Sequence, residues 1–207
     1  MEIEAKFGIP DVQTLQRLRT ASSLGGYTLS AGSSVEVSDT YLDSEGRQIL
    51  AAGYVCRRRE QEGRVLMTVK GLAAPNAGIH RREEWEVALG SDRPPMLWPD
   101  GGAKDAVLRW VGGASLIPLF ELQQTRFVRM MHRSRRPVAQ LSLDDVRMAA
   151  RDHTQSYMEA EVELTPGGTE QDLALIVACL TDEWLLPPEP RSKFERGLAF
   201  WEASLAQ

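Results

Sequence analysis

The chain opens with Glu2-Ile3-Glu4-Ala5-Lys6, and the interpretation of the whole sequence depends on this stretch. Successive side chains of an extended strand point to opposite faces, so the three charged residues share one face at intervals of about 7 Å. The apolar residues between them share the other face. On a single strand this pattern is typical of a protein surface, with the apolar side on the core and the charges in water. The interpretation changes because similar rows of charge return later in the chain.

Three later segments repeat charged residues at every second position, with the signs largely segregated. These rows are Arg57 and Arg59; Arg82, Glu84 and Glu86; and Glu159, Glu161 and Glu163. Carboxylates repeated along a strand repel one another, so such rows are costly unless cations lie between them. Oxygen-only sites suit Mg²⁺ or Mn²⁺, and arginine forks suit phosphate oxygens. The rows therefore favour a metal-and-phosphate site over an ordinary sandwich, whose outward faces would mix the charges.

Strand patterns separated by short turns predominate along the chain, and helices lie between and after them. We predict strands over residues 1–8, 27–31, 34–42, 54–60, 64–70, 79–89, 116–124, 125–133, 137–148 and 155–165. We predict helices over residues 11–24, 48–52, 103–111 and 170–186, and a last one capped by Ser192. Residues 71–78 are predicted to be a loop. About eight strands in this arrangement predict an α+β fold, with an antiparallel barrel and helices packed outside.

The composition is that of an ordinary globular protein, and we treat residues 1–207 as a single domain. No apolar run approaches about 18 residues, so no membrane association is expected. The net charge of −5 argues against a general nucleic-acid binder. Two cysteines require no disulfide, and the protein is expected to be cytoplasmic. The three histidines have no metal-site spacing, and the five tryptophans are expected to pack with apolar neighbours.

A series of motifs in this order resembles the CYTH, or triphosphate tunnel metalloenzyme, superfamily. The opening stretch matches its ExExK signature, and Glu159 to Glu163 matches its ExExE strand. The remaining matches are Val55 to Glu60 for LRxR, Thr68 to Gly71 for the lysine strand, Arg82 to Glu86 for RxExE, Thr125-Arg126, Leu143-Asp144 and Ser192-Lys193. The chain is most similar to the bacterial inorganic triphosphatases, without their appended helical CHAD domain.

The resemblance implies an eight-stranded antiparallel β-barrel, open as a tunnel with a charged lumen. It implies a triphosphate-binding set: Lys6, Arg57, Arg59, Lys70, Arg82, Arg126 and Lys193. It implies metal ligands for Mg²⁺ or Mn²⁺: Glu2, Glu4, Asp144, Glu159, Glu161 and Glu163. Glu4 and Asp144 are candidates for taking the proton of the attacking water, and Lys6 for tuning that network.

The expected reaction is metal-dependent hydrolysis of inorganic triphosphate to pyrophosphate and phosphate. Thiamine triphosphatase, nucleoside triphosphatase, class IV adenylate cyclase and a non-catalytic polyphosphate or nucleotide sensor stay open as alternatives. The oligomeric state is open too, with a homodimer as one alternative. Cys56 and Arg58 depart from the aliphatic residues that the family favours, and Arg58 is expected on the outer face. Asp43, in Tyr41-Leu42-Asp43, is expected to cap the turn that follows it.

Overall fold

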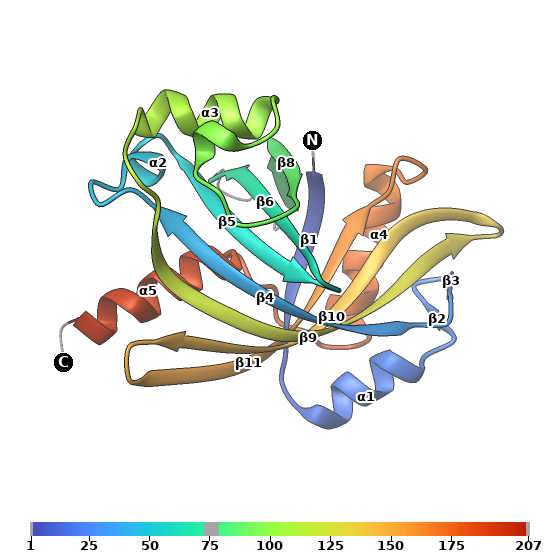
Figure 1. The fold of residues 1–207 in the computed structure, drawn as a ribbon. Coiled ribbons are helices and arrows are strands. Elements are labelled where there is room, and N and C mark those ends of the chain that lie inside the picture. Colours follow the sequence, from blue (N-terminus) through green and yellow to red (C-terminus); the bar gives the residue numbers. More distant parts are fainter. Residues whose placement is uncertain (1, 73–78, 206–207) are drawn as a thin grey trace.

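The structure, a computed structural model, describes residues 2–72 and 79–205 (Figure 1). Eleven β-strands in this part of the chain form one sheet, and helices surround it. The strands are β1 (Glu2–Ile9), β2 (Ser23–Leu24), β3 (Tyr27–Leu29), β4 (Ser33–Asp43), β5 (Tyr54–Gln61), β6 (Arg64–Gly71), β7 (Ile79–Arg82), β8 (Glu84–Leu89), β9 (Ile117–Arg133), β10 (Arg136–Ala150) and β11 (His153–Leu164). The helices are α1 (Val12–Thr20), α2 (Gln48–Ala51), the 3-10 helix η1 (Pro95–Leu97), α3 (Gly102–Val111), α4 (Glu170–Asp182) and α5 (Lys193–Leu205).

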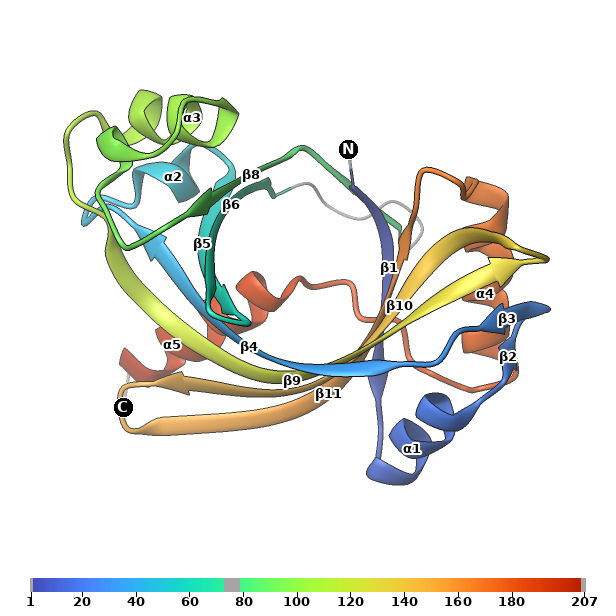
Figure 2. The ribbon, with the colours of Figure 1, turned by 45° about the vertical axis from the view of Figure 1, so that its right-hand side comes forward.

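The sheet curls into a closed barrel. Its strand order is β7-β1-β11-β10-β9-β4-β5-β6-β8, and the neighbours along this path are antiparallel. Only Glu83 separates β7 from β8, so these two strands act as one bent strand of the barrel, which pairs with β1 on one side and with β6 on the other. Figure 2 shows the resulting ring. When β7 and β8 are counted as one strand, the barrel has eight strands, which confirms the predicted eight-stranded antiparallel barrel.

Several predicted boundaries differ from the observed ones. The strands predicted over 116–124 and 125–133 are one strand, β9, because no glycine or proline occurs between Leu119 and Arg133, where the predicted boundary lay. The first helix ends at Thr20 rather than residue 24, and residues 23–24 pair with β3 instead. Helix α4 ends at Asp182 rather than residue 186. There Leu185 takes a left-handed φ of 55°, and the Leu186 N–H bonds the Leu180 carbonyl, which closes the helix end. The predicted loop at 71–78 lies outside the described residues from residue 73 on.

Two groups of helices cover the outside of the barrel (Figure 2). Helices α1 and α4 cover the β1, β10 and β11 side, where Phe7 is 1% exposed and packs in one cluster with Leu18 and Ile176. Helices α2 and α3 cover β5, β6 and β8, where Ile49, Val69 and Val107 are buried together. The core of this barrel therefore lies between the sheet and the helices, and the apolar face of each strand points outward.

Helix α5 closes one end of the barrel interior. It packs on β9 and β10, and Phe194 joins Tyr41, Val55 and Val146 in an apolar cluster. Gly197 permits this close approach, since a Cβ there would lie 2.1 Å from the ring of Phe120. The charged cavity lies on the other side of this apolar cluster, and Tyr41, Val55 and Phe194 line the cavity at the boundary between the two.

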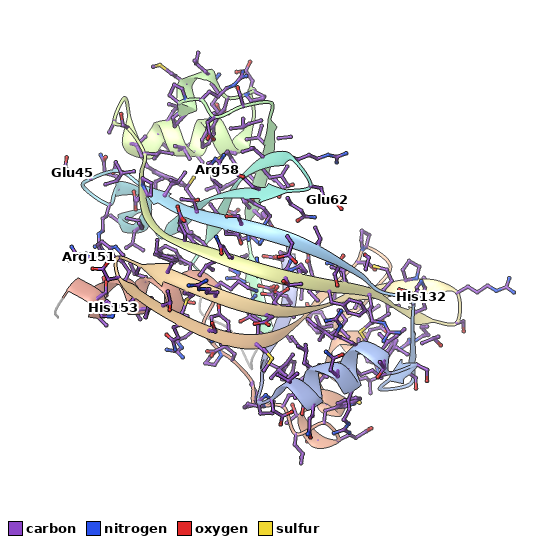
Figure 3. The ribbon with its side chains drawn as sticks, turned by 60° about the horizontal axis from the view of Figure 1, so that its bottom comes forward. Glu45, Arg58, Glu62, His132, Arg151 and His153 are labelled. Carbon is purple, nitrogen blue, oxygen red and sulfur yellow. The ribbon has the colours of Figure 1, made fainter. Side chains whose placement is uncertain are left out.

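The histidines are dispersed over the barrel, and the tryptophans lie in its apolar clusters. His132 and His153 lie at opposite ends of the long β9 and β11 strands, too far apart to share a metal (Figure 3). The tryptophans pack against apolar clusters, with Trp98 buried at 3% exposure. Among the described helices, none has the length and apolar character needed to cross a membrane.

Candidate functional site

The register of three adjacent strands brings the predicted acidic residues together. Strand β11 lies between β1 and β10, and its Glu161 is paired across the strands with Lys6. Glu159 is paired in the same way with Asp144 of β10. The alternate residues, such as Val162, are fully buried on the outer side. The charged residues of these strands therefore face the lumen, as predicted. This is the reverse of the usual small barrel, whose interior is filled by apolar side chains.

A cavity of 720 Å³ occupies the lumen, and nearly all the predicted site residues line it. The lining residues from the predicted set are Glu2, Glu4, Lys6, Arg57, Arg59, Lys70, Arg82, Arg126, Glu161, Glu163 and Lys193. The remaining two, Asp144 and Glu159, are fully buried directly behind this lining. Glu84 and Glu86 also line the cavity. The fold thus brings these lining residues together from eight different strands and helices.

Three carboxylates form the tightest acidic group, which we call the carboxylate trio: Asp144, Glu159 and Glu161. One oxygen from each lies within 4.8 Å of the others, and no other three carboxylates within the described residues come so close. The ammonium of Lys193 contacts all three, at 2.8 Å from Asp144 Oδ2, 3.0 Å from Glu161 Oε1 and in direct contact with Glu159 Oε1. An oxygen-only cluster of this kind fits a hard divalent cation.

The other predicted metal ligands lie in the cavity but outside the trio. Glu4 contacts Lys6 at 3.1 Å and also pairs with Arg82. Because Lys6 contacts Glu161 as well, it links Glu4 to the trio. Glu2 accepts a 2.9 Å bond from Lys70, and its second oxygen is buried and has no hydrogen-bond partner among the residues that the structure describes.

Charges around the trio set the protonation of its members in opposite directions. Burial raises the pKa of Glu159, and the nearby ammonium of Lys193 only partly offsets that effect. Burial would also raise the pKa of Glu161, but Lys193, Lys6 and Arg126 together hold it well below its usual range. The pKa of Asp144 is likewise lowered despite burial, by Lys193 and Arg126. Glu161 and Asp144 are thus anionic oxygen donors at neutral pH.

Arginines from β5 and β9 line the cavity next to the trio and across from it, and we call them the basic wall: Arg57, Arg59 and Arg126. Arg126 donates to both carboxylate oxygens of Asp144, from Nε at 2.8 Å and from Nη2 at 2.6 Å. Its Nη2 also donates to Glu161 Oε2 at 2.6 Å. Arg57 donates to the Thr68 hydroxyl at 3.2 Å. Arg126 therefore connects the basic wall directly to the carboxylate trio.

Lys193 enters the site from the amino end of α5. Ser192 and Glu195 cap this end reciprocally, with the Glu195 N–H donating to Ser192 Oγ at 3.2 Å. This confirms Ser192 as the predicted cap. A lysine at a helix amino terminus opposes the helix dipole, and here the trio supplies the compensating negative charge.

Two residues of the site escaped the sequence reasoning. Asp39 of β4 is fully buried, accepts two hydrogen bonds from Arg59 and lies 3.8 Å from Arg57. The sequence pattern places Asp39 on the same face of its strand as Val37 and Tyr41, which could have indicated its position. A single aspartate in a strand of mixed residues is weak evidence for a site. Arg196 of α5 holds the second oxygen of Glu159 at 3.0 Å. Its position one turn after Lys193 was the available signal.

The remaining motif residues lie where the sequence suggested. Arg58 is on the outer face, where its Nη2 bonds Asp92 at 2.9 Å; Figure 3 shows it on the α3 side of the barrel. Cys56 is buried beneath α2 and α3. Asp43 accepts bonds from the backbone N–H groups of Ser44, Ile49 and Leu50 at 2.7 to 3.0 Å, which confirms its capping role.

Comparison with known proteins finds a match over most of the chain. The model of the CYTH domain family matches residues 1–198. Among solved structures, HpAC1 from Hippeastrum, described as a candidate adenylyl cyclase with a dominant triphosphatase activity, has a TM-score of 0.73 at 18% identity over 96% of each chain. A candidate adenylate cyclase from Bacillus halodurans has a TM-score of 0.61 at 20% identity, over 95% of this chain and 96% of that chain. The Mimivirus capping enzyme triphosphatase has a TM-score of 0.51 at 12% identity, over 86% and 89% of the two chains. A search of the curated proteins finds no match.

Proposed function

Because this chain belongs to the CYTH domain family, whose model spans residues 1–198, we propose that it hydrolyses inorganic triphosphate to pyrophosphate and phosphate with Mg²⁺ or Mn²⁺. One observation carries the proposal: Glu161 of the carboxylate trio and the three arginines of the basic wall line the same 720 Å³ cavity, and the other two carboxylates of the trio lie within 4.8 Å of Glu161. The trio suits a hard cation, and the basic wall suits a polyanion. The proposal treats residues 1–207 as one domain that contains the whole site.

The basic residues bind the substrate in this proposal. Triphosphate carries several negative charges, and seven side chains of opposite charge face the cavity: Lys6, Arg57, Arg59, Lys70, Arg82, Arg126 and Lys193. Arginine forks can bind two phosphate oxygens at once, which aligns the chain as well as holding it. Alignment matters most here, because phosphoryl transfer depends chiefly on positioning and electrostatic stabilisation.

The acidic residues would hold the metal that positions the attacking water. Asp144, Glu159 and Glu161 would hold one divalent ion, and Glu2, Glu4 and Glu163 line the space for a second one. When bound, the metal would neutralise phosphate charge and lower the pKa of the attacking water. Glu4 or Asp144 would take the proton of that water, and Lys6 contacts both Glu4 and Glu161.

In the reaction, the water oxygen attacks the terminal phosphorus and the bond from that phosphorus to the bridging oxygen breaks. Pyrophosphate leaves on the side of the basic wall, where positive charge offsets the charge that develops on its oxygen. The aromatic rings at the closed end of the cavity pack on one another, with Tyr41 and Phe120 stacked at 4.8 Å. Ring faces already in use offer little to a thiamine or adenine group, which favours an inorganic substrate.

A substrate panel tests the proposal. Phosphate release is measured from tripolyphosphate, ATP and thiamine triphosphate with Mg²⁺ or Mn²⁺, and cyclic AMP is assayed directly. We expect tripolyphosphate to be the preferred substrate and EDTA to abolish turnover. Formation of cyclic AMP would favour the cyclase alternative, and no activity on any substrate would refute the proposal.

Carboxamide variants test the acidic residues separately from the basic ones. Glu161→Gln and Glu4→Gln should each lower turnover by about 100-fold or more while triphosphate binding stays detectable. Glu121→Gln is a matched control, because Glu121 is exposed on the outer face of β9. Equal loss of binding and turnover, or of neither, would contradict the assigned roles. Binding without turnover in the wild-type protein would instead favour the sensor alternative.

A further inference from the structure

Asp39 lies behind the basic wall rather than in the cavity. It is fully buried on β4, and its two oxygens accept bonds from Arg59 Nε at 2.7 Å and Arg59 Nη2 at 2.8 Å. Arg57 Nε lies 3.8 Å from the same carboxylate, and Gln124 donates to it at 3.1 Å. Both arginines line the cavity, whereas Asp39 does not. One buried carboxylate therefore contacts both arginines of β5 from behind.

Two arginines at alternate positions of a strand need such a partner. Arg57 and Arg59 point to the same face about 7 Å apart, and their like charges repel when both are largely buried. Asp39 relieves that repulsion because it is paired across the strands with Arg59, and its neighbour Tyr41 with Arg57. The bidentate pair fixes the plane of the Arg59 guanidinium and leaves its Nη1 for another acceptor. The carboxylate thus sets the direction in which the Arg59 guanidinium faces the cavity, and its charge holds Arg57 at 3.8 Å from its Oδ1 atom.

We propose that Asp39 is a positioning residue of the phosphate-binding wall, which holds Arg57 and Arg59 at the separation and orientation that a chain of phosphates requires. The inference rests on the proposed triphosphate function and adds a residue to it. Asp39 acts through the two arginines and does not touch the substrate, since no part of it reaches the cavity. Gln124 supports Asp39 from β9 but does not replace its bonds to the arginines.

Charge and geometry predict opposite effects when Asp39 is changed. If the wall acted only through its positive potential, Asp39→Asn would remove a negative charge and triphosphate would bind more tightly. If alignment matters, the same change would leave the two guanidinium groups without their shared carboxylate, and triphosphate binding would weaken. Asp39→Glu keeps the charge and the ion pair but moves the carboxylate by one methylene, so it changes geometry alone.

The test compares triphosphate and pyrophosphate binding by titration calorimetry in EDTA, where turnover does not interfere. We expect Asp39→Asn and Asp39→Glu to weaken triphosphate binding by about tenfold or more. The loss should be larger for triphosphate than for pyrophosphate, because the longer chain spans both arginines. Glu60→Gln is the matched control: it removes an exposed carboxylate of β5 that contacts Arg58 on the outer face, and we expect its triphosphate affinity to stay within about twofold of wild type. Melting temperatures identify any variant that is not folded.

The outcomes separate this inference from the proposed function. Unchanged or tighter triphosphate binding by Asp39→Glu would overturn the positioning role, even if Asp39→Asn failed to fold. An equal loss for triphosphate and pyrophosphate would also overturn it, because a general loosening of the barrel has no length dependence. Absence of triphosphate binding by the wild-type protein in EDTA would overturn it as well. Turnover of tripolyphosphate with Mg²⁺ by the wild-type protein reports on the proposed function independently of all three results.

Discussion

Replacement of Lys193 with methionine tests whether the carboxylate trio is a metal site. The Lys193 ammonium contacts Asp144, Glu159 and Glu161 at once and is 5% exposed. It therefore occupies the centre of the oxygen atoms that a divalent ion would bind. Methionine keeps much of the side-chain volume but removes the charge, so the ion and the lysine no longer compete for the same oxygens.

The structure sets the size of the expected effect. Removing one partner from a buried ion cluster costs about 3–5 kcal/mol, because the remaining charges stay buried and unpaired. For a chain of this size each kcal/mol corresponds to about 2–4 °C in melting temperature, so the variant should melt roughly 6–20 °C lower in EDTA. An ion at 100 times its dissociation constant restores about 2.7 kcal/mol, and more if the variant binds the ion more tightly. Mg²⁺ should therefore raise the melting temperature more in Lys193→Met than in the wild-type protein.

The assay is thermal unfolding in EDTA and across a series of Mg²⁺ concentrations, with metal affinity from titration calorimetry. Lys70→Met is the control, because Lys70 contacts Glu2 at 2.9 Å and Glu84 at 3.2 Å but is not bonded to the trio. We expect Lys193→Met to bind Mg²⁺ more tightly and triphosphate more weakly than the wild-type protein. If Mg²⁺ affinity and the Mg²⁺-dependent rise in melting temperature were the same in both proteins, the trio would not be the metal site.

Two further predictions concern stability. Arg57 and Arg59 overcome the effect of burial and lower the pKa of Asp39 from 3.8 to about 2, so its stabilising contribution is complete above about pH 4 and is lost as the pH falls towards 2. Urea unfolding of Asp39→Asn should lack this acid-dependent loss, on the order of 2 kcal/mol, and an identical pH profile would contradict the assignment. Arg129 donates to the carbonyls of Ser30 at 2.7 Å and Ala21 at 2.6 Å. Arg129→Met should therefore lower the free energy of unfolding by about 2–3 kcal/mol and leave triphosphate affinity unchanged. A loss of triphosphate affinity would instead implicate Arg129 in the site.

Local patterns in the sequence were enough to identify which side chains face the lumen. A period of two is a property of the strand itself, so Glu2, Glu4 and Lys6 had to share a face wherever the strand lay. The caps at Asp11 and Ser192 were readable for the same reason, since each bonds a backbone N–H three residues away. Segregation of acidic and basic rows then indicated which face was the functional one.

Only the tertiary structure decided which charges meet. The phase of a strand defines its face but not its register, and the register depends on packing between segments far apart in the chain. Lys6 lies opposite Glu161, and Lys193 contacts Asp144, which is 49 positions away in sequence, because the barrel closes and α5 packs across its end. Asp39 was invisible for the same reason: a lone aspartate becomes a partner of two arginines only when β4 pairs with β5 in this register. The sequence by itself determined the kinds of charge that the lumen contains, and the folding of the sheet into a closed barrel decided how those charges combine into a site.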